Sequence, residues 1–263
     1  MNVLPKKSLG QNFLINKNII KNIVDYGEVN SNDIVIEIGP GTGNLSEEII
    51  EKKPKKFYAI EKDENLCLKL KEKFKSNINV INKDVLQVNW DKFLEERIIV
   101  FGNLPYNISA KILIEWIRLN NLNNLFCKLI LMFQKEVADR IVADVNSKEY
   151  GRLSILTNWK MTAKKIMDLG PENFFPKPKI KSSLVYFEPK IKYFKFENSI
   201  NLEKVTNIFF QNKRKMIKKP LNILFKNPKR IINRLDLDEK CRPQNLDPLI
   251  FYKITKEFET ETD

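Results

Sequence analysis

Residues 33–46 have the sequence DIVIEIGPGTGNLS. The apolar run at 34–38 predicts a short buried strand, and helix-forming residues begin at Asn44. Between them lie three glycines with the spacing GxGxG, which let the backbone approach a ligand closely at a strand-to-helix turn. Dinucleotide-binding loops have the spacing GxGxxG instead. The stretch therefore predicts the first strand of an α/β domain and a ligand loop that differs from a dinucleotide loop.

Strands and helices alternate along the first two-thirds of the chain. Further strands are expected at 57–60, 79–81, 98–101, 125–133, 163–169 and 183–187. Helices are expected at 44–52, 65–74, 109–116, 134–145 and 153–159. Only helices follow residue 190, at 202–224, at 228–235 and from 247 onward. Such a pattern predicts a mostly parallel sheet covered on both faces, in a domain of residues 1–190, followed by a small helical domain of residues 191–263.

Composition excludes several kinds of chemistry. The 263 residues include no histidine and three cysteines, Cys67, Cys127 and Cys241, with no CxxC pair. Histidine-based catalysis and histidine-ligated metals are therefore excluded, and we expect no metal site and no disulfide. No stretch approaches the roughly 20 apolar residues that span a bilayer. With no secretory signal in the first residues, we expect a cytoplasmic protein without membrane contact.

The charge of the chain indicates a polyanionic partner. Its net charge is +13 and its pI is about 9.4. A basic segment, residues 211–230, holds eight of the basic residues and no acidic one. Solvated helix faces usually mix both signs, so a segment of one sign favours phosphate binding. The expected RNA-binding residues within it are Lys213, Arg214, Lys215, Lys218 and Lys219. The alternative is a general excess of lysine and asparagine from an AT-rich genome.

Two carboxylates follow expected strands. Glu61 ends the second strand and is suited to accept hydrogen bonds from ribose hydroxyls. Asp84 follows the third strand and is suited to accept one from an adenine amino group. An ordinary charged turn is the alternative for Glu61, and the alternative for Asp84 is that aspartate is common at strand ends. Together with the glycine loop they favour a cofactor that contains adenosine, although Glu61 alone does not distinguish NAD from S-adenosylmethionine.

The sequence NLPY at Asn103–Tyr106 follows the fourth strand, where open α/β sheets place their ligand crevice. It resembles the [DN]-P-P-[YF] motif of enzymes that methylate exocyclic amines, whose lone pair is delocalised into the ring. The Asn103 side-chain oxygen and the Leu104 carbonyl oxygen would accept from the amine and favour a pyramidal, nucleophilic nitrogen. Pro105 fixes the turn, and Tyr106 offers a face on which a base stacks, worth about 1–3 kcal/mol. An isolated turn is the alternative.

A proline-rich loop, Asn173–Ser182, contains FFPKPKIK. An aromatic ring in a rigid loop beside lysines is suited to a flipped base and its backbone. A structural loop with a core phenylalanine is the alternative.

These motifs together resemble one family, the ribosomal RNA adenine N6-dimethyltransferases of the KsgA and Dim type. The resemblance covers essentially the whole chain. It runs through KKSLGQNFL, EIGPGTGNLS, NLPYNIS, FFPKPKIKSS, FFQNKRKMIKKPL and RPQNLDPLIF. It implies a Rossmann-like class I methyltransferase sheet that uses S-adenosylmethionine, with a C-terminal helical domain that binds rRNA.

The resemblance also implies roles for single residues. Asn12 and Leu14 would form an N-terminal cofactor clamp, and Tyr106 and Phe174 would sandwich the target adenine, Phe174 because the family pattern is F-x-P. The implied cofactor-binding residues are Asn12, Leu14, Gly39, Gly41, Glu61, Asp84 and Asn103. The implied catalytic residues are Asn103, Leu104, Pro105, Tyr106 and Phe174.

The implied substrate is small-subunit (16S) rRNA within a pre-ribosomal 30S particle. Two adjacent adenosines in a hairpin loop near its 3′ end would each receive two methyl groups, from an enzyme that we expect to be a monomer active in ribosome biogenesis. The chain departs from the family at Asn44, where relatives vary, and at Pro220, which interrupts the basic segment.

Three other functions fit part of the sequence. Erythromycin-resistance methylases share the fold and modify large-subunit rRNA, but Leu104 and the segments FFQNKRK and RPQNL are closer to the KsgA type. A non-catalytic assembly factor is disfavoured by the intact NLPY. An NAD oxidoreductase is disfavoured by the GxGxG spacing and the basic segment.

Overall fold

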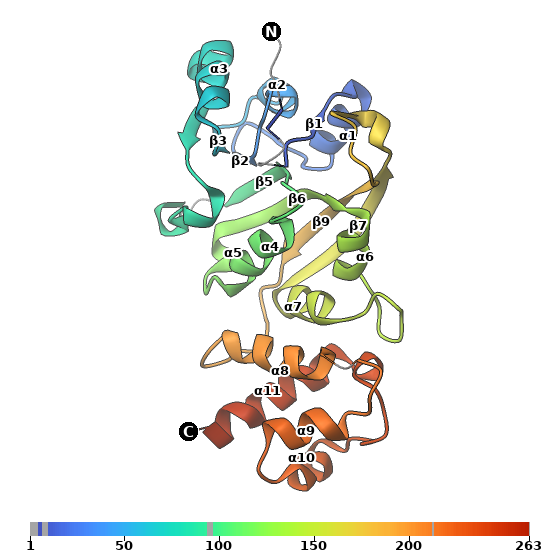
Figure 1. Ribbon diagram of the computed structural model, residues 1–263. Coiled ribbons are helices and arrows are strands. Elements are labelled where there is room, and N and C mark those ends of the chain that lie inside the picture. The colour runs from blue at the N-terminus through green and yellow to red at the C-terminus, as the bar shows by residue number, and fades with distance from the viewer. Residues whose placement is uncertain (1–4, 7–9, 94–96, 212, 263) are drawn as a thin grey trace. The chain divides into compact units, whose positions relative to one another are not determined.

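The computed structural model describes residues 5–6, 10–93, 97–211 and 213–262 (Figure 1). Residues 7–9 of the motif KKSLGQNFL and residue 212 of the basic segment lie outside the described residues. The chain divides into two compact units. The first contains the residues up to Ala138 together with Thr162–Pro189, and the second contains Asp139–Met161 and the residues from Lys190 onward. The chain thus enters the second unit twice, and that unit includes a segment that lies before residue 191.

A seven-stranded sheet forms the centre of the first unit (Figure 1). Its strand order is β4-β3-β2-β5-β6-β9-β7. The strands are β2 (Ile34–Ile38), β3 (Lys56–Glu61), β4 (Asn79–Asn82), β5 (Ile98–Asn103), β6 (Phe126–Gln134), β7 (Met161–Leu169) and β9 (Ser182–Pro189). The pairs from β4 to β6 are parallel, and β9 is antiparallel to β6. From β2 the chain adds β3 and β4 on one side of the sheet and then returns to add β5 and β6 on the other side. A ligand crevice is expected at the carboxyl ends of β2 and β5, where this change of direction occurs.

Helices supply the apolar side chains that cover this sheet. In and near the first unit they are α1 (Lys17–Asp25), α2 (Asn44–Glu51), α3 (Glu64–Phe74), α4 (Ser109–Arg118), α5 (Leu122–Leu125) and α6 (Lys135–Ile141). Ile23 of α1 and Ile49 of α2 share one core cluster with the sheet residues Val35 and Ile99. Alternate strand residues point to the opposite face, where Trp116 of α4 packs with Trp90 and Phe126 at ring distances of 5.4–5.6 Å. The sheet is therefore covered on both faces, as the alternation of strands and helices predicts.

Helices make up the second unit. They are α7 (Arg152–Lys160), α8 (Ile200–Phe210), α9 (Lys218–Leu224), α10 (Pro228–Leu235) and α11 (Pro248–Thr262). Phe209 of α8 packs edge-on against Phe251 of α11, with ring centroids 5.3 Å apart. Within the described residues, none of the helices is both long enough and apolar enough to cross a bilayer.

Two predicted helices are wrong in extent. The helix expected at 134–145 ends at Ile141. The helix expected at 202–224 is two helices, α8 and α9, with residues 211–217 between them. Pro220 lies in the first turn of α9, where its missing N–H leaves no helical hydrogen bond unmade. Part of the basic segment is thus a connection between helices and not a continuous helix.

Candidate active site

A cavity lies at the carboxyl ends of β2, β3, β4 and β5, where the strand order reverses. The loop after β2, the end of β3, the residue Asp84 after β4 and the turn after β5 all line it, together with the segment Gly10–Leu14. The expected cofactor-binding residues Asn12, Leu14, Gly39, Gly41, Glu61, Asp84 and Asn103 all line this cavity. So do four of the five expected catalytic residues, Asn103, Leu104, Pro105 and Tyr106. The structure therefore brings together residues that lie up to 94 positions apart in the sequence.

The glycine loop needs glycine for two different reasons. Gly39 and Gly41 have φ angles of +66° and +58°, a left-handed conformation that other residues rarely adopt. A Cβ atom on Gly41 would lie 2.6 Å from the Phe13 ring, so the loop packs tightly against the N-terminal segment. Among the atoms of the described residues outside its own turn, a Cβ atom on Gly39 would have only the Asn103 carbonyl oxygen within 4 Å, at 3.8 Å. Gly39 thus leaves open space between the loop and Asn103, which a ligand can use.

Glu61 presents a buried carboxylate at this cavity. It is 7% exposed, its Oε1 accepts from the Asp63 N–H at 2.9 Å, and its Oε2 accepts from the Gly41 N–H at 3.2 Å. Burial raises the pKa of Glu61, and these backbone hydrogen bonds oppose the rise. The two contacts fix the carboxylate in one orientation beside the glycine loop.

Asp84 is held by an ion pair and a backbone hydrogen bond. Its Oδ2 lies 2.9 Å from Lys62 Nζ, and its Oδ1 accepts from the Leu86 N–H at 3.0 Å. Burial acts to raise the pKa of Asp84, but the hydrogen bonds and the Lys62 charge together lower it. The group is therefore an ionised acceptor at neutral pH.

The turn after β5 is fixed at both its ends. Asn103 Nδ2 donates to the Asn12 carbonyl oxygen at 2.6 Å, and among the described residues the Asn103 Oδ1 atom has no hydrogen-bond partner. The Tyr106 hydroxyl is hydrogen-bonded to the Ser182 hydroxyl at the start of β9. Burial raises the pKa of Tyr106, so its hydroxyl stays protonated. Because the Asn103 amide nitrogen is hydrogen-bonded to Asn12, its amide oxygen is the atom that can accept a hydrogen bond from a ligand.

The segment Gly10–Leu14 forms one wall of the cavity and is held from several directions. Its strand β1 (Phe13–Leu14) pairs antiparallel with β8 (Phe174–Phe175). Asn44 Nδ2, at the start of α2, donates to the Leu14 carbonyl oxygen at 2.7 Å. The segment is thus joined to the glycine loop, to the turn after β5 and to the proline-rich loop.

Comparison with known proteins agrees with this geometry. A family model described as ribosomal RNA adenine dimethylase matches residues 3–260. The chain belongs to this family. It is 51% identical to ribosomal RNA small subunit methyltransferase A of Pelagibacter ubique over 98% of each chain. It is 41% identical to the protein of that name from a Wolbachia of Drosophila simulans, over 92% of this chain and 89% of that one.

A solved structure of the same kind shares the fold of both units. A dimethyladenosine transferase from Plasmodium falciparum has a TM-score of 0.82 and 28% sequence identity, and the match covers 95% of this chain and 98% of that one. The Rossmann-like class I methyltransferase fold predicted from the sequence is thereby confirmed. As a ribosomal RNA adenine dimethylase, the chain is a methyltransferase.

One residue expected in the dimethylase site does not lie in it. Phe174 is 1% exposed, packs in the hydrophobic core and is not among the described residues that line the cavity. A ring enclosed on both faces has no room to stack on a base, so the expectation that Phe174 sandwiches the adenine is not met in this structure. Its neighbour Phe175 is 57% exposed, because alternate residues of a strand point to opposite sides. Sequence order alone does not tell which of the two rings is free.

A second cavity adjoins the first. Gly10, Gln11, Asn12 and Tyr106 line both cavities, and the proline-rich loop from Pro176 to Ile180 forms a further wall of the second. Tyr106 therefore stands between the space suited to the cofactor and a space open to the proline-rich loop.

The expected RNA-binding residues lie in the second unit, between α8 and α9 and in the first turn of α9. Arg214, Lys215, Lys218 and Lys219 are exposed. Lys213 is half-buried, and its Nζ donates to the Lys148 carbonyl oxygen at 2.7 Å. Within the part of the chain that the structure describes, these exposed cations have no hydrogen bond or ion pair through their side chains, apart from the pair of Lys218 with Glu239 at 3.4 Å.

Sequence reasoning missed three residues that hold the site. Asn44 ties the N-terminal segment to α2, Ser182 holds Tyr106, and Asp63 contacts both Glu61 and the N-terminal segment. Of these three residues, Asp63 is the one that the sequence could have indicated, because an aspartate directly before a helix predicts an N-cap. Its second contact depends on the tertiary fold.

Proposed function

We propose that the chain transfers methyl groups from S-adenosylmethionine to the N6 amines of adenosines in small-subunit rRNA. The observation that carries this proposal is the orientation of Asn103. Its amide nitrogen is engaged by the Asn12 carbonyl oxygen, so its oxygen faces the cavity that the glycine loop and Glu61 also line. The small-subunit enzymes at 51% and 41% identity support this substrate over large-subunit rRNA.

The cavity fits the cofactor by the chemistry of its walls. Glu61 is an oriented carboxylate for two ribose hydroxyls, and Asp84 is an ionised acceptor for an adenine amino group. The open space beside Gly39 would be filled by any side chain there. When bound, S-adenosylmethionine supplies an electrophilic methyl group.

The chain's own residues prepare the amine. Asn103 Oδ1 and the Leu104 carbonyl oxygen accept its two N–H groups, which favours a pyramidal nitrogen with a free lone pair. Pro105 fixes the turn that carries both acceptors. The amine proton becomes acidic only as the nitrogen becomes cationic, so no general base acts before the transfer, in a chain without histidine.

The finer parts of the proposal concern the substrate. Two adjacent adenosines in the 3′-terminal hairpin loop would each be dimethylated, within an assembling 30S particle, by a monomer in the cytoplasm. The exposed cations of the second unit would bind the rRNA backbone. Neutralising the exposed residues Arg214, Lys215 and Lys219 together should weaken RNA binding and reduce its salt dependence. If the dependence of the RNA-binding constant on salt concentration is unchanged, these cations do not bind the rRNA backbone.

Methyl transfer to purified subunits tests the whole proposal. With labelled S-adenosylmethionine, the wild-type protein should label unmethylated small subunits. Asn103→Ala should lose this activity but still bind the cofactor, with reduced affinity. Full activity of Asn103→Ala contradicts the mechanism. Labelling of large subunits in place of small ones would assign the chain to the erythromycin-resistance type.

A further inference from the structure

Asp63 follows the proposed cofactor carboxylate Glu61 by two residues and lies directly before α3. Its side chain is 3% exposed, and its Oδ1 accepts from the Asn65 N–H at 3.1 Å as the N-cap of the helix. This contact is an ordinary helix cap, and it uses only one of the two carboxylate oxygens.

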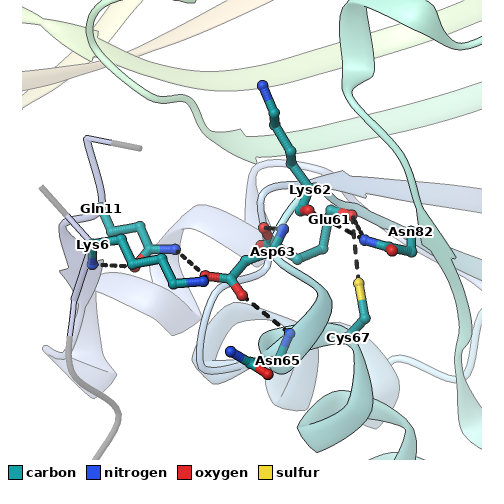
Figure 2. A network of polar contacts seen from close by, with 8 residues as sticks. All are labelled: Lys6, Gln11, Glu61, Lys62, Asp63, Asn65, Cys67 and Asn82. Carbon is teal, nitrogen blue, oxygen red and sulfur yellow. Dashed lines mark hydrogen bonds and ion pairs between the residues drawn. The ribbon is translucent and has the colours of Figure 1, made fainter. Parts of the chain in front are cut away.

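The other oxygen reaches the N-terminal segment. Figure 2 shows Lys6 and Gln11 converging on Asp63, with Lys6 Nζ 2.8 Å and Gln11 Nε2 3.3 Å from Oδ2. Gln11 Oε1 in turn accepts from the Lys6 N–H at 2.7 Å. Burial acts to raise the pKa of Asp63, but the contacts with Lys6 and Gln11 lower it, so the carboxylate is ionised at neutral pH.

These contacts bear on the cofactor site from two sides. Gln11 and the residues that follow it form a wall of the cavity, and the Asp63 N–H orients the Glu61 carboxylate at 2.9 Å. A helix cap alone would need neither Lys6 nor Gln11. Asp63 thus contacts both the Glu61 carboxylate and the N-terminal segment that lines the cavity.

We propose that Asp63 is a positioning residue, and that its contacts with Lys6 and Gln11 form a latch that keeps the N-terminal wall closed and slows cofactor dissociation. The proposal rests on the proposed function, because it takes S-adenosylmethionine as the occupant of the cavity. A charged pair between an exposed lysine and a buried carboxylate predicts an effect of about 3- to 10-fold on the dissociation rate.

Variants at Lys6 separate the latch from the helix cap. Lys6→Met removes the ion pair and leaves the Asn65 and Glu61 contacts of Asp63 unchanged, and Lys6→Arg should restore the latch. Asp63→Asn keeps an oxygen for the cap and removes the charge. Lys73→Met is the matched control, because it removes the exposed pair of α3 with Glu47, at 3.3 Å, away from the cavity.

The experiment measures the dissociation rate of labelled S-adenosylmethionine from the full-length protein. We expect Lys6→Met and Asp63→Asn to release it about 3- to 10-fold faster, and Lys6→Arg and Lys73→Met to match the wild type. The double variant with Lys6→Met and Asp63→Asn should be no faster than Asp63→Asn alone. About 0.5 M salt should accelerate release from the wild type more than from Lys6→Met, because salt screens the pair.

Equal rates for Lys6→Met and the wild type would overturn the latch while leaving the proposed function intact. So would a double variant that released S-adenosylmethionine faster than Asp63→Asn alone, because in the latch Lys6 acts through the Asp63 carboxylate. If the wild-type protein does not bind S-adenosylmethionine at all, both the latch and the proposed function are overturned.

Discussion

Replacing Asn103 by aspartate would change a hydrogen-bond donor into an acceptor at a fixed contact. Asn103 Nδ2 lies 2.6 Å from the Asn12 carbonyl oxygen. The variant would place a carboxylate oxygen against a carbonyl oxygen at this distance. Either the N-terminal wall of the cavity moves away, or the carboxyl takes up a proton and donates it to Asn12.

The size of the effect follows from what each variant loses. Asn103→Ala loses one hydrogen bond, worth about 0.5–1.5 kcal/mol, so cofactor affinity should fall about 2- to 10-fold. Asn103→Asp loses the same bond and adds the cost of a partly buried, unpaired acceptor, about 1–3 kcal/mol. At pH 8 its affinity should therefore fall about 10- to 1000-fold. At pH 6 the loss should be smaller, because protonation restores a donor.

Calorimetric titration of the three proteins with S-adenosylmethionine at pH 8 and pH 6 tests this order. The ratio of the two variants' affinities is the informative quantity, because other titrating groups affect both variants alike. We expect the aspartate variant to bind more weakly than the alanine variant at pH 8, and the gap to narrow at pH 6. Equal or tighter binding by the aspartate variant at pH 8 would refute the orientation of the amide and, with it, the role given to Asn103 Oδ1.

Three further predictions concern the rest of the site. Gly41→Ala places a side chain at a left-handed backbone conformation, which costs about 1–2 kcal/mol, and makes its Cβ atom clash with Phe13. Thermal unfolding should therefore occur at a lower temperature, and the cofactor should bind more weakly. An unchanged melting temperature would contradict the close packing. Burial raises the pKa of Glu37 to about 8, so between about pH 4.5 and 8 this carboxyl is protonated in the folded state and ionised in the unfolded state. The free energy of unfolding should therefore fall with rising pH in this range, by at most about 1.4 kcal/mol per pH unit. Glu37→Gln should remove this slope in denaturant titrations, and equal slopes in the two proteins would count against a buried acid. Ser182→Ala removes the hydrogen bond that holds the Tyr106 ring, so kcat for methylation should fall several-fold while cofactor affinity stays unchanged. Tyr106→Phe removes the same bond and should have the same effect. A double variant with a much lower kcat than either single variant would show that the two residues do not act through this bond.

The cofactor loop and the polar residues of the cavity could be predicted from the sequence because each depends on local signals. Gly39, Glu61, Asp84 and Asn103 all lie at the end of a strand or just after it, and the carboxyl ends of parallel strands share one edge of the sheet. Chemistry and position were therefore enough to place them together.

The contacts that hold the walls of the site could not be predicted, because they join segments that are distant in the sequence. The strands β1 and β8 are two residues long each and have no periodicity to detect. Which of Phe174 and Phe175 is buried depends on their register against β1, and a one-residue shift would exchange their roles. The ion pair of Asp63 with Lys6 links residues 57 positions apart.

Mapping of modified adenosines is the most direct test of the function proposed for this chain. Small subunits from a strain that lacks the dimethylase would be incubated with the purified protein and S-adenosylmethionine, and the rRNA digested and analysed by mass spectrometry. The account predicts N6,N6-dimethyladenosine at two adjacent positions of the 3′-terminal hairpin with the wild-type protein, and none with Asn103→Ala. Absence of dimethyladenosine with the wild type, or its formation by Asn103→Ala at the wild-type rate, would contradict it.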